Sequence, residues 1–497
     1  MTISVTHADR SGAPLHGLLP LWVGFAIYAL LLVAGNALLN DPDTLWQITV
    51  GQWILDHHTV PIIDIYSFTM RGAPWISTEW LAQVMYAAVY DWAGWAGPVM
   101  LAALSVAATF ALFTRHLAAR ISGTATLVFA SAALALTAPH LLARPHVLAM
   151  PLMVLWIGGL ITAADRRDAP SFRLLPWMAL WANLHGSFVF GLMMVGPIAL
   201  DAILGAEPNA RKALVVRWAV FGVAALLASF CTPYGWDVLL ASAKILNLGA
   251  ALPLIIEWRP QDFGSIGVFE LCLLLGIALA LYRGVRLPPM RIAMLLGLLH
   301  MALSQNRAAG ILALVAPIVL AAPLARQIGA ADVSAGEKMT PRSRALLACI
   351  CAVVLAGTAL FASLRTYAPN AHAAPAAAVA ALKRLKVTRV FNDYDFGGYL
   401  IASGVAPFID GRTELYGKKF FVDYSAASDL KDPDRLFHLL DQYGVQATLL
   451  RTQSAANKLL DHVDGWQKVY SDKIATIHVR RRGARHTREP AVDPAAK

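Results

Sequence analysis

The first hydrophobic segment, residues 18–39, runs directly into Asn40-Asp41-Pro42-Asp43-Thr44-Leu45-Trp46. Two carboxylates therefore lie where a membrane-spanning helix meets water, and charge costs far less there than at the centre of a bilayer. One interpretation is that Asp41 and Asp43 only cap the next helix, since Asp, Pro and Asp are typical of a helix start. Capping accounts for one acid, so we predict that the pair also meets a lipid-linked head group and a water-soluble acceptor.

The composition is that of a polytopic membrane protein. The 497-residue chain is 58% hydrophobic and only 14% charged, and its mean hydropathy is +0.56, which is more apolar than a soluble domain of this size. The net charge of +10 comes from basic residues spread over short loops and a terminal tail. Positive-inside topology and anionic lipids explain this pattern better than nucleic acid does. The four cysteines lie in apolar segments and are expected to be small core residues.

The apolar segments predict about eleven membrane helices within residues 1–364. Residues 18–39 form the first helix, which we expect to be retained because Asp41-Pro42-Asp43 is a poor signal-cleavage site. Further single spans are expected at residues 98–113, 121–138, 147–164, 218–231, 266–282 and 345–364.

Two longer apolar segments, residues 174–204 and 287–324, have basic loops on both sides and so begin and end on the same face. Each is expected to form a hairpin of two short helices, about 15 residues or 22 Å long in the first case. Such hairpins do not reach the far surface. Their polar tips, near His185 and Arg307, are therefore expected to line a cavity inside the protein.

The charges of the loops predict the orientation. Residues 40–95 hold six acidic residues and one basic residue, Arg71, so they form the first external loop. The loops after residues 98–113 and 147–164 are basic and are expected in the cytoplasm. The N-terminus is therefore predicted to be cytoplasmic, and residues 365–481 to lie outside.

From residue 365 the composition changes to that of a small α/β domain, residues 365–481. We expect strands and helices to alternate there, with strands at residues 388–391, 407–409, 447–450 and 474–479 and helices at residues 375–386 and 433–443. Gly397, Gly398 and Gly411 are interpreted as hairpin turns, and Asp410 with Arg412 as a local salt bridge. Residues 482–497 are basic, then rich in Pro and Ala, and are expected to be disordered.

Two helices are expected in the first external loop. Residues 44–55, with Trp46 and Trp53, fit a helix that lies in the membrane interface. A second helix begins at Ser77-Thr78-Glu79-Trp80, where the helix dipole favours Glu79 in the first turn. Asp56-His57-His58 is not expected to bind a metal ion, because neighbouring histidines on a helix point apart.

Polar residues that interrupt the apolar sequence fall on the external side: Asp41, Asp43, Asp64, Glu79, Arg144, His146, His185, Glu257, Arg259 and Arg307. Polar groups at membrane depth are costly, so they are usually functional or mutually paired. For any one of them, an ordinary ion pair between loops is an equal alternative. For the whole set, we favour one outward-facing pocket.

Three stretches of the first loop resemble a known family, namely Asp41-Pro42-Asp43-Thr44-Leu45-Trp46, Pro61-Ile62-Ile63-Asp64 and Ser77-Thr78-Glu79-Trp80-Leu81. This loop resembles the first external loop of the C-type (GT-C) glycosyltransferases, which include protein O-mannosyltransferases, aminoarabinose transferases of lipid A and oligosaccharyltransferases. Members are polytopic, carry an acid just after the first helix and often end in an external soluble domain, and all three features occur here. The chain is also similar to bacterial membrane proteins that share Asn392-Asp393-Tyr394-Asp395-Phe396-Gly397-Gly398-Tyr399 and Ile409-Asp410-Gly411-Arg412. The Trp-Trp-Asp-type signature of oligosaccharyltransferases is absent.

The resemblance implies an inverting transfer of a sugar from a polyprenyl-phosphate carrier to an extracytoplasmic acceptor. It places the protein in the bacterial inner membrane. Membrane lipids are expected as partners, and nucleic acid is not. Asp43 is the implied base, followed by Asp41, with Asp64 and Glu79 as further catalytic candidates. Arg144, His146 and Arg307 are candidates to bind the donor phosphate. The remaining cavity candidates are His185, Glu257 and Arg259. No metal ligands are assigned, and the pattern leaves a divalent metal open as a cofactor.

Two functions from other classes stay open. A transporter or flippase of lipid-linked glycan would use the same cavity, although the sequence shows no internal repeat and its acids lie at one face only. A non-enzymatic envelope-assembly protein would act through its C-terminal domain and would tolerate the loss of Asp43. Donor consumption by the wild type and by Asp43→Asn separates these functions.

Overall fold

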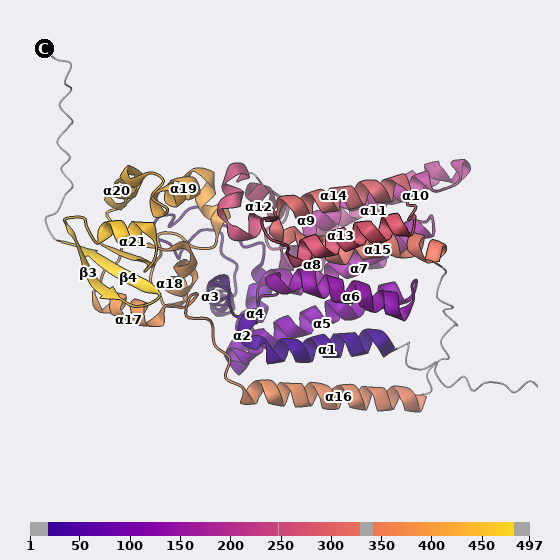
Figure 1. Cartoon of the computed structure of the whole chain (residues 1–497), viewed down its shortest axis with the longest axis horizontal. Coiled ribbons are helices and arrows are strands. Elements are labelled where there is room, and N and C mark those ends of the chain that lie inside the picture. The colour runs from indigo at the N-terminus through magenta and orange to yellow at the C-terminus, as the bar shows by residue number, and fades with distance from the viewer. Residues whose placement is uncertain (1–17, 247, 329–340, 482–497) are drawn as a thin grey trace, which may run out of the picture.

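The computed structural model describes residues 18–246, 248–328 and 341–481. It has two parts, a bundle of helices that run side by side and a small domain with a sheet at one end of that bundle (Figure 1). The tail predicted to be disordered, residues 482–497, lies outside the described residues.

The segments predicted to span the membrane singly each contain a helix: α1 (Leu19–Val33), α5 (Ala96–Ala118), α6 (Gly123–Thr137), α7 (Pro145–Asp165), α11 (Pro208–Ser229), α13 (Val268–Tyr282) and α16 (Pro341–Leu364). Among the described residues, 4 helices are long and apolar enough to cross a membrane, namely α5, α7, α11 and the segment Asn306–Gln327. The shorter apolar helices include α1, α13 and Ala348–Leu364. The structure therefore has a helical membrane region, and the count of about eleven spans stays a prediction.

Both predicted hairpins are present, and the second differs from the expectation. In the first, α8 (Leu175–Leu184) turns at residues 185–187 into α9 (Phe188–Met193) and α10 (Val195–Leu204). In the second, α14 (Pro289–Ser304) leads through η6 (Asn306–Ala308) into α15 (Ala309–Ile328). The expectation of two short helices is wrong here, because Asn306–Gln327 is 22 residues long and apolar enough to cross the membrane.

The first external loop holds α3 (Asp43–His57) and α4 (Trp80–Ala93), and the short α2 (Gly35–Leu38) precedes them. The expectation that Trp46 faces the lipid head groups is wrong, because Trp46 is only 5% exposed. Trp46 packs in a cluster with Val50, Ile54, Trp75 and Ile401. Ile401 belongs to the C-terminal domain, so this domain covers the face that the tryptophan pattern assigned to lipid.

The later external loop, between α11 and α13, also packs on the C-terminal domain. It contains α12 (Asp237–Leu246) and the short helices η4 (Gly249–Leu254) and η5 (Ile256–Trp258). Leu248 and Ala251 share one apolar cluster with Phe391 and Phe408 of the domain. The two external loops therefore lie between the membrane helices and the domain.

The C-terminal domain is a 4-stranded sheet with the order β1-β2-β4-β3, covered by helices. β1 (Val390–Asn392) pairs in parallel with β2 (Ala447–Arg451), and β4 (Ala475–Arg480) is antiparallel to both β2 and β3 (Trp466–Ser471). The helices are α17 (Ala376–Arg384), α18 (Gly397–Ala402), α19 (Thr413–Ser428), α20 (Pro433–Gln442) and α21 (Ala455–Leu460). The predicted strands β1, β2 and β4 are confirmed. The sequence prediction missed β3, and residues 407–409 join β1 through a single bridge at Pro407 instead of forming a strand.

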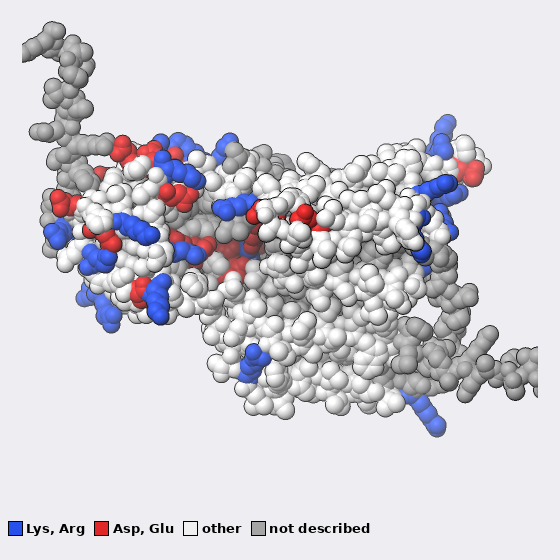
Figure 2. All heavy atoms as spheres, in the orientation of Figure 1, with Lys and Arg blue, Asp and Glu red and all other residues white. Residues whose placement is uncertain are grey.

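Charge is distributed unevenly over the surface. Figure 2 shows a broad band of uncharged atoms over the helix bundle, with charged side chains over the C-terminal domain and at the opposite end of the bundle. Acidic atoms gather in the hollow between the domain and the bundle.

Candidate functional site

Arg144 is the centre of an ion-pair cluster at the end of the bundle that faces the C-terminal domain. It directly precedes α7, and its guanidinium lies 3.2 Å from Asp41 Oδ2 and 2.7 Å from Asp43 Oδ2. The same guanidinium lies 2.7 Å from Glu257 Oε1, which comes from η5 of the later external loop. One arginine thus joins the acid pair of the first loop to the second loop.

The two aspartates of the pair have different contacts. Asp41 Oδ1 accepts the backbone N–H of Asp43 at 2.6 Å, which satisfies one free donor at the start of α3, so the capping interpretation holds for Asp41. Asp43 Oδ1 instead accepts the indole N–H of Trp46 at 3.0 Å. Each carboxylate oxygen has two lone pairs, so Asp43 keeps capacity to accept a further proton or hydrogen bond.

Burial and charge act in opposite directions on these acids. Burial raises the pKa of Asp41 to about 7, against the attraction of Arg144. Burial likewise raises the pKa of Asp43 above its ordinary value. Arg144 is the main cause that lowers the pKa of Glu257 to about 2. At neutral pH the stable anion of the cluster is therefore Glu257, while Asp41 lies near its titration point.

Glu79 forms a second polar group beside this cluster. Its Oε2 accepts the side-chain N–H of Gln47 at 2.7 Å, and its Oε1 lies 3.3 Å from His185 Nε2. His185 Nδ1 accepts the backbone N–H of Ser187, so Nε2 carries the proton that faces Glu79. Burial raises the pKa of Glu79 to about 7 and lowers that of His185 well below its ordinary value.

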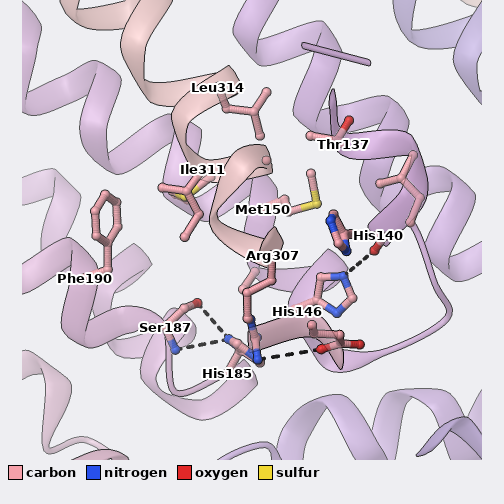
Figure 3. Close-up of a pocket in the computed structure, with 15 residues that line it drawn as sticks. Thr137, His140, His146, Met150, His185, Ser187, Phe190, Arg307, Ile311 and Leu314 are labelled. Atoms are coloured by element: carbon pink, nitrogen blue, oxygen red, sulfur yellow. Dashed lines mark hydrogen bonds and ion pairs between the residues drawn. The ribbon is translucent and has the colours of Figure 1, made fainter. Parts of the chain in front are cut away.

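A cavity of about 100 Å³ opens beside these groups, and Figure 3 shows its two different halves. Charged and aromatic nitrogen groups line one half: His140, His146, His185, Glu257 and Arg307. Apolar side chains line the other half: Leu141, Met150, Met153, Phe190, Ile311 and Leu314. The apolar half lies between α7, α9 and α15, so the cavity runs from a polar head, which contains Arg307, towards the membrane helices.

Arg307 is held at the tip of the second hairpin, in η6. Its guanidinium lies 4.7 Å from the ring of Trp258 and 3.8 Å from Glu257 Oε2. His146 Nε2 donates to the carbonyl oxygen of His140 at 2.8 Å, and the His146 ring lies 6.3 Å from that of His185. The tips of both hairpins therefore border the cavity, as their polar sequences predict.

Eight of the ten predicted site residues lie together. Arg144, Glu257, Asp41 and Asp43 form the ion-pair cluster, Glu79 and His185 the adjoining pair, and His146 and Arg307 line the cavity. Only His146, His185, Glu257 and Arg307 of the ten line the cavity, so the expectation that the whole set lines one pocket is wrong. Asp64 is fully buried against Arg412, and Arg259 is exposed and bonds to the carbonyl oxygen of Pro253.

The sequence did not predict some residues that lie near the site. Gln47 holds Glu79, and Glu414 of the C-terminal domain accepts the indole N–H of Trp75 at 3.1 Å. The interpretation of Asp410 and Arg412 as a local salt bridge is incomplete, because Arg412 also pairs with Asp64 at 2.7 Å. In the sequence, this contact is indicated by the motif Ile409-Asp410-Gly411-Arg412, which by itself is typical of turn geometry.

Within residues 18–246, 248–328 and 341–481, no group of three or more His, Cys, Asp or Glu side chains is arranged to hold a metal ion. The acids of the site are grouped around Arg144 instead.

The helix bundle with its terminal domain is similar in fold to a solved structure, and this similarity supports the fold that the sequence resemblance implies. ArnT from Cupriavidus metallidurans, solved bound to undecaprenyl phosphate, is 13% identical, with a TM-score of 0.50 over 95% of this chain and 99% of that chain. The archaeal oligosaccharyltransferase AglB from Archaeoglobus fulgidus, in complex with an inhibitory peptide and a dolichol-phosphate, is 11% identical, with a TM-score of 0.49 over 95% of this chain and 75% of that chain. No known protein family and no curated protein matches the sequence.

Proposed function

We propose that this protein is an integral membrane glycosyltransferase that moves a sugar from a polyprenyl-phosphate carrier to an acceptor outside the cytoplasm. The observation that carries this proposal is the divided cavity. The side chains that line its apolar half match the chemistry of an isoprenoid chain, and Arg307 in its polar half matches that of a phosphate. Arg144 connects that polar half to Asp43, because it contacts both Glu257 and Asp43 at 2.7 Å.

In the proposed reaction, the acceptor hydroxyl gives its proton to Asp43 while its oxygen bonds to the anomeric carbon of the sugar. The bond between that carbon and the phosphate oxygen breaks, and the phosphate leaves with the electron pair. Arg307 and Arg144 hold the negative charge that develops on the phosphate. Attack from the side opposite the phosphate inverts the configuration of the anomeric carbon.

The distribution of charge supports an orientation with the C-terminal domain outside the cytoplasm. Basic side chains gather at the end of the bundle away from the domain (Figure 2), as the positive-inside rule requires of the cytoplasmic end. We therefore propose the inner membrane of a bacterium, with a cytoplasmic N-terminus and a periplasmic domain. A reporter fused after Arg481 that is active only in the cytoplasm would contradict this orientation.

The direct test is donor turnover by the purified protein in lipid nanodiscs. Synthetic polyprenyl-phosphate sugars are supplied with a mixture of glycan and lipid acceptors, and the release of lipid phosphate is followed by mass spectrometry. A glycosyltransferase is expected to release lipid phosphate and to form a new glycoside. A flippase or an assembly protein would leave the donor intact.

Glu257→Gln is expected to strengthen the binding of undecaprenyl phosphate by about tenfold, since a hydrogen bond to a charged group contributes roughly 1.5–3 kcal/mol. Glu257 now contacts both arginines proposed to hold the phosphate, so its carboxylate competes with that phosphate. Binding is measured by competition with a labelled lipid phosphate. Asp262→Asn, an exposed acid of the same loop, is the control. Weaker binding in Glu257→Gln would mean that Glu257 assists the donor.

Transfer is expected to lose rate as the pH falls, and to lose it above the ordinary pKa of an aspartate. A general base works only when it is ionised, and burial raises the pKa of Asp43, so its action is lost as the pH falls through that raised pKa. Asp41, with a pKa of about 7, shares Arg144 and titrates with it. The measurement is kcat/KM against pH, with thermal unfolding followed at each pH. If kcat/KM falls only around pH 3.8, the ordinary pKa of an aspartate, the assignment of Asp43 as the base is contradicted.

A further inference from the structure

The C-terminal domain touches the start of α3, the helix that carries Asp43, at two glycines. A side-chain carbon at Gly411 would lie 2.0 Å from Asp43 Oδ1 and 3.0 Å from Trp46 Nε1. A side-chain carbon at Gly398, in α18, would lie 2.1 Å from the carbonyl oxygen of Pro42. Neither glycine has a left-handed φ, so each provides space for close approach and not a special backbone conformation.

Arg412, which follows Gly411, joins the C-terminal domain to the first external loop. Its Nη1 donates to Asp64 Oδ1 at 2.7 Å, and its Nε and Nη2 donate to the two oxygens of Asp410 at 2.8 and 2.7 Å. All three side chains are 0% exposed. The guanidinium also lies 4.7 Å from the ring of Trp75 and 5.2 Å from that of Tyr66. Arg412 is therefore enclosed by residues of both parts of the protein.

Hydrogen bonds extend this contact on both sides of Arg412. Thr69 donates its hydroxyl to the carbonyl oxygen of Phe408 at 2.7 Å, and the backbone N–H of Phe68 donates to the carbonyl oxygen of Pro407. The indole of Trp75 donates to Glu414. The domain is therefore docked over several residues of the first external loop, and the docked position brings Gly411 against Asp43.

We propose that the C-terminal domain positions the Asp43 carboxylate, with Gly411 and Gly398 setting its distance from α3 and Arg412 keeping it docked. This inference rests on the proposed function, in which Asp43 is the base. Gly411, Gly398 and Arg412 are positioning residues that act through Asp43. The periplasmic domain is thus part of the catalytic centre.

The contacts of Asp43 give the physical reason why the domain sets the orientation of its carboxylate. Asp43 Oδ1 lies between the indole of Trp46 and Gly411, and Oδ2 lies on Arg144, so the carboxylate has one orientation. A methyl group at Gly411 would overlap Oδ1 and turn the carboxylate away from Arg144. Catalytic groups need to be held within about 0.5 Å of their working position, and a displacement of about 1 Å can cost 100-fold in rate.

Gly411→Ala is the test. We expect kcat to fall by about 100-fold, while the variant stays folded and still binds undecaprenyl phosphate. Gly297→Ala is the control, because no atom lies within 4 Å of the carbon added there. Full kcat in Gly411→Ala would overturn the proposal. A parallel fall of kcat, affinity and stability would also overturn it, since the contact would then serve folding alone.

Arg412→Lys is the second variant, because it adds no atom that clashes. Lysine is a point charge that cannot form the fork to two carboxylates, so docking loosens and kcat is expected to fall at constant donor affinity. If neither variant yields a folded protein that binds undecaprenyl phosphate, the contact serves folding and the proposal is wrong.

A structure of Gly411→Ala separates this inference from the proposed function. We expect the Asp43–Arg144 ion pair, 2.7 Å in the wild type, to be broken. If the pair is intact, Gly411 does not position Asp43. If the wild type transfers no sugar and the pair is broken in the variant, the proposed function fails while the positioning of Asp43 stands.

Discussion

Asp43→Asn is expected to abolish sugar transfer, with a loss of roughly 100- to 10,000-fold in rate, and to leave expression and folding intact. The amide keeps the shape of the carboxylate and can still accept the indole N–H of Trp46, but it cannot take a proton. The measurement is release of lipid phosphate from a polyprenyl-phosphate sugar by purified protein.

Asp56→Asn serves as the control, because this acid is exposed near the other end of α3. Asparagine is nearly as good a helix cap as aspartate, so a capping residue would tolerate the change at position 43. Full transfer by Asp43→Asn would therefore remove Asp43 from the mechanism. Asp41, which shares Arg144, would then be the next candidate for the base.

Arg412→Met is expected to destabilise the protein by about 3–5 kcal/mol, the usual cost of removing one partner from a buried ion pair. Asp64 and Asp410 would then be fully buried without a cation. The measurement is the midpoint of thermal unfolding of the full chain in detergent.

Lys431→Met is the matched control, because Lys431 and its partner Asp429 are 63% and 54% exposed, and an exposed pair contributes at most about 1 kcal/mol. Combining Arg412→Met with Asp64→Asn and Asp410→Asn removes all three charges and is expected to recover part of the loss. If Arg412→Met unfolds at the same temperature as Lys431→Met, the buried ion pair does not hold the domain in place.

The sequence alone predicted most of the candidate site, because charge in an apolar chain is easy to see. His185 and Arg307 interrupt long hydrophobic segments, and the cost of burying polar groups in a membrane requires that they find partners. The structure places both at the cavity. The same reasoning misplaced Asp64, because a carboxylate near the membrane pairs equally well with an arginine far away in sequence, and Arg412 was that arginine.

Helix and strand patterns were predicted where periodicity is local. The strands at β1, β2 and β4 are apolar runs, whereas β3 (Trp466–Ser471) is exposed along most of its length and so lacks that signal. The expectation for α3 failed for a different reason. Tryptophan is suited to both a lipid interface and a protein interface, and only the packing of Ile401 on Trp46 shows which one is present.

Local physical chemistry therefore determined the membrane character, the external acid pair and the polar hairpin tips, because hydropathy and charge act on each segment independently of its neighbours. Only the tertiary structure decided which acids share Arg144, that Glu257 faces both arginines, and that Gly411 touches Asp43. Those contacts join residues separated by 50 to more than 300 positions, and no local pattern encodes a partner at such a distance. Close packing of the whole chain creates them.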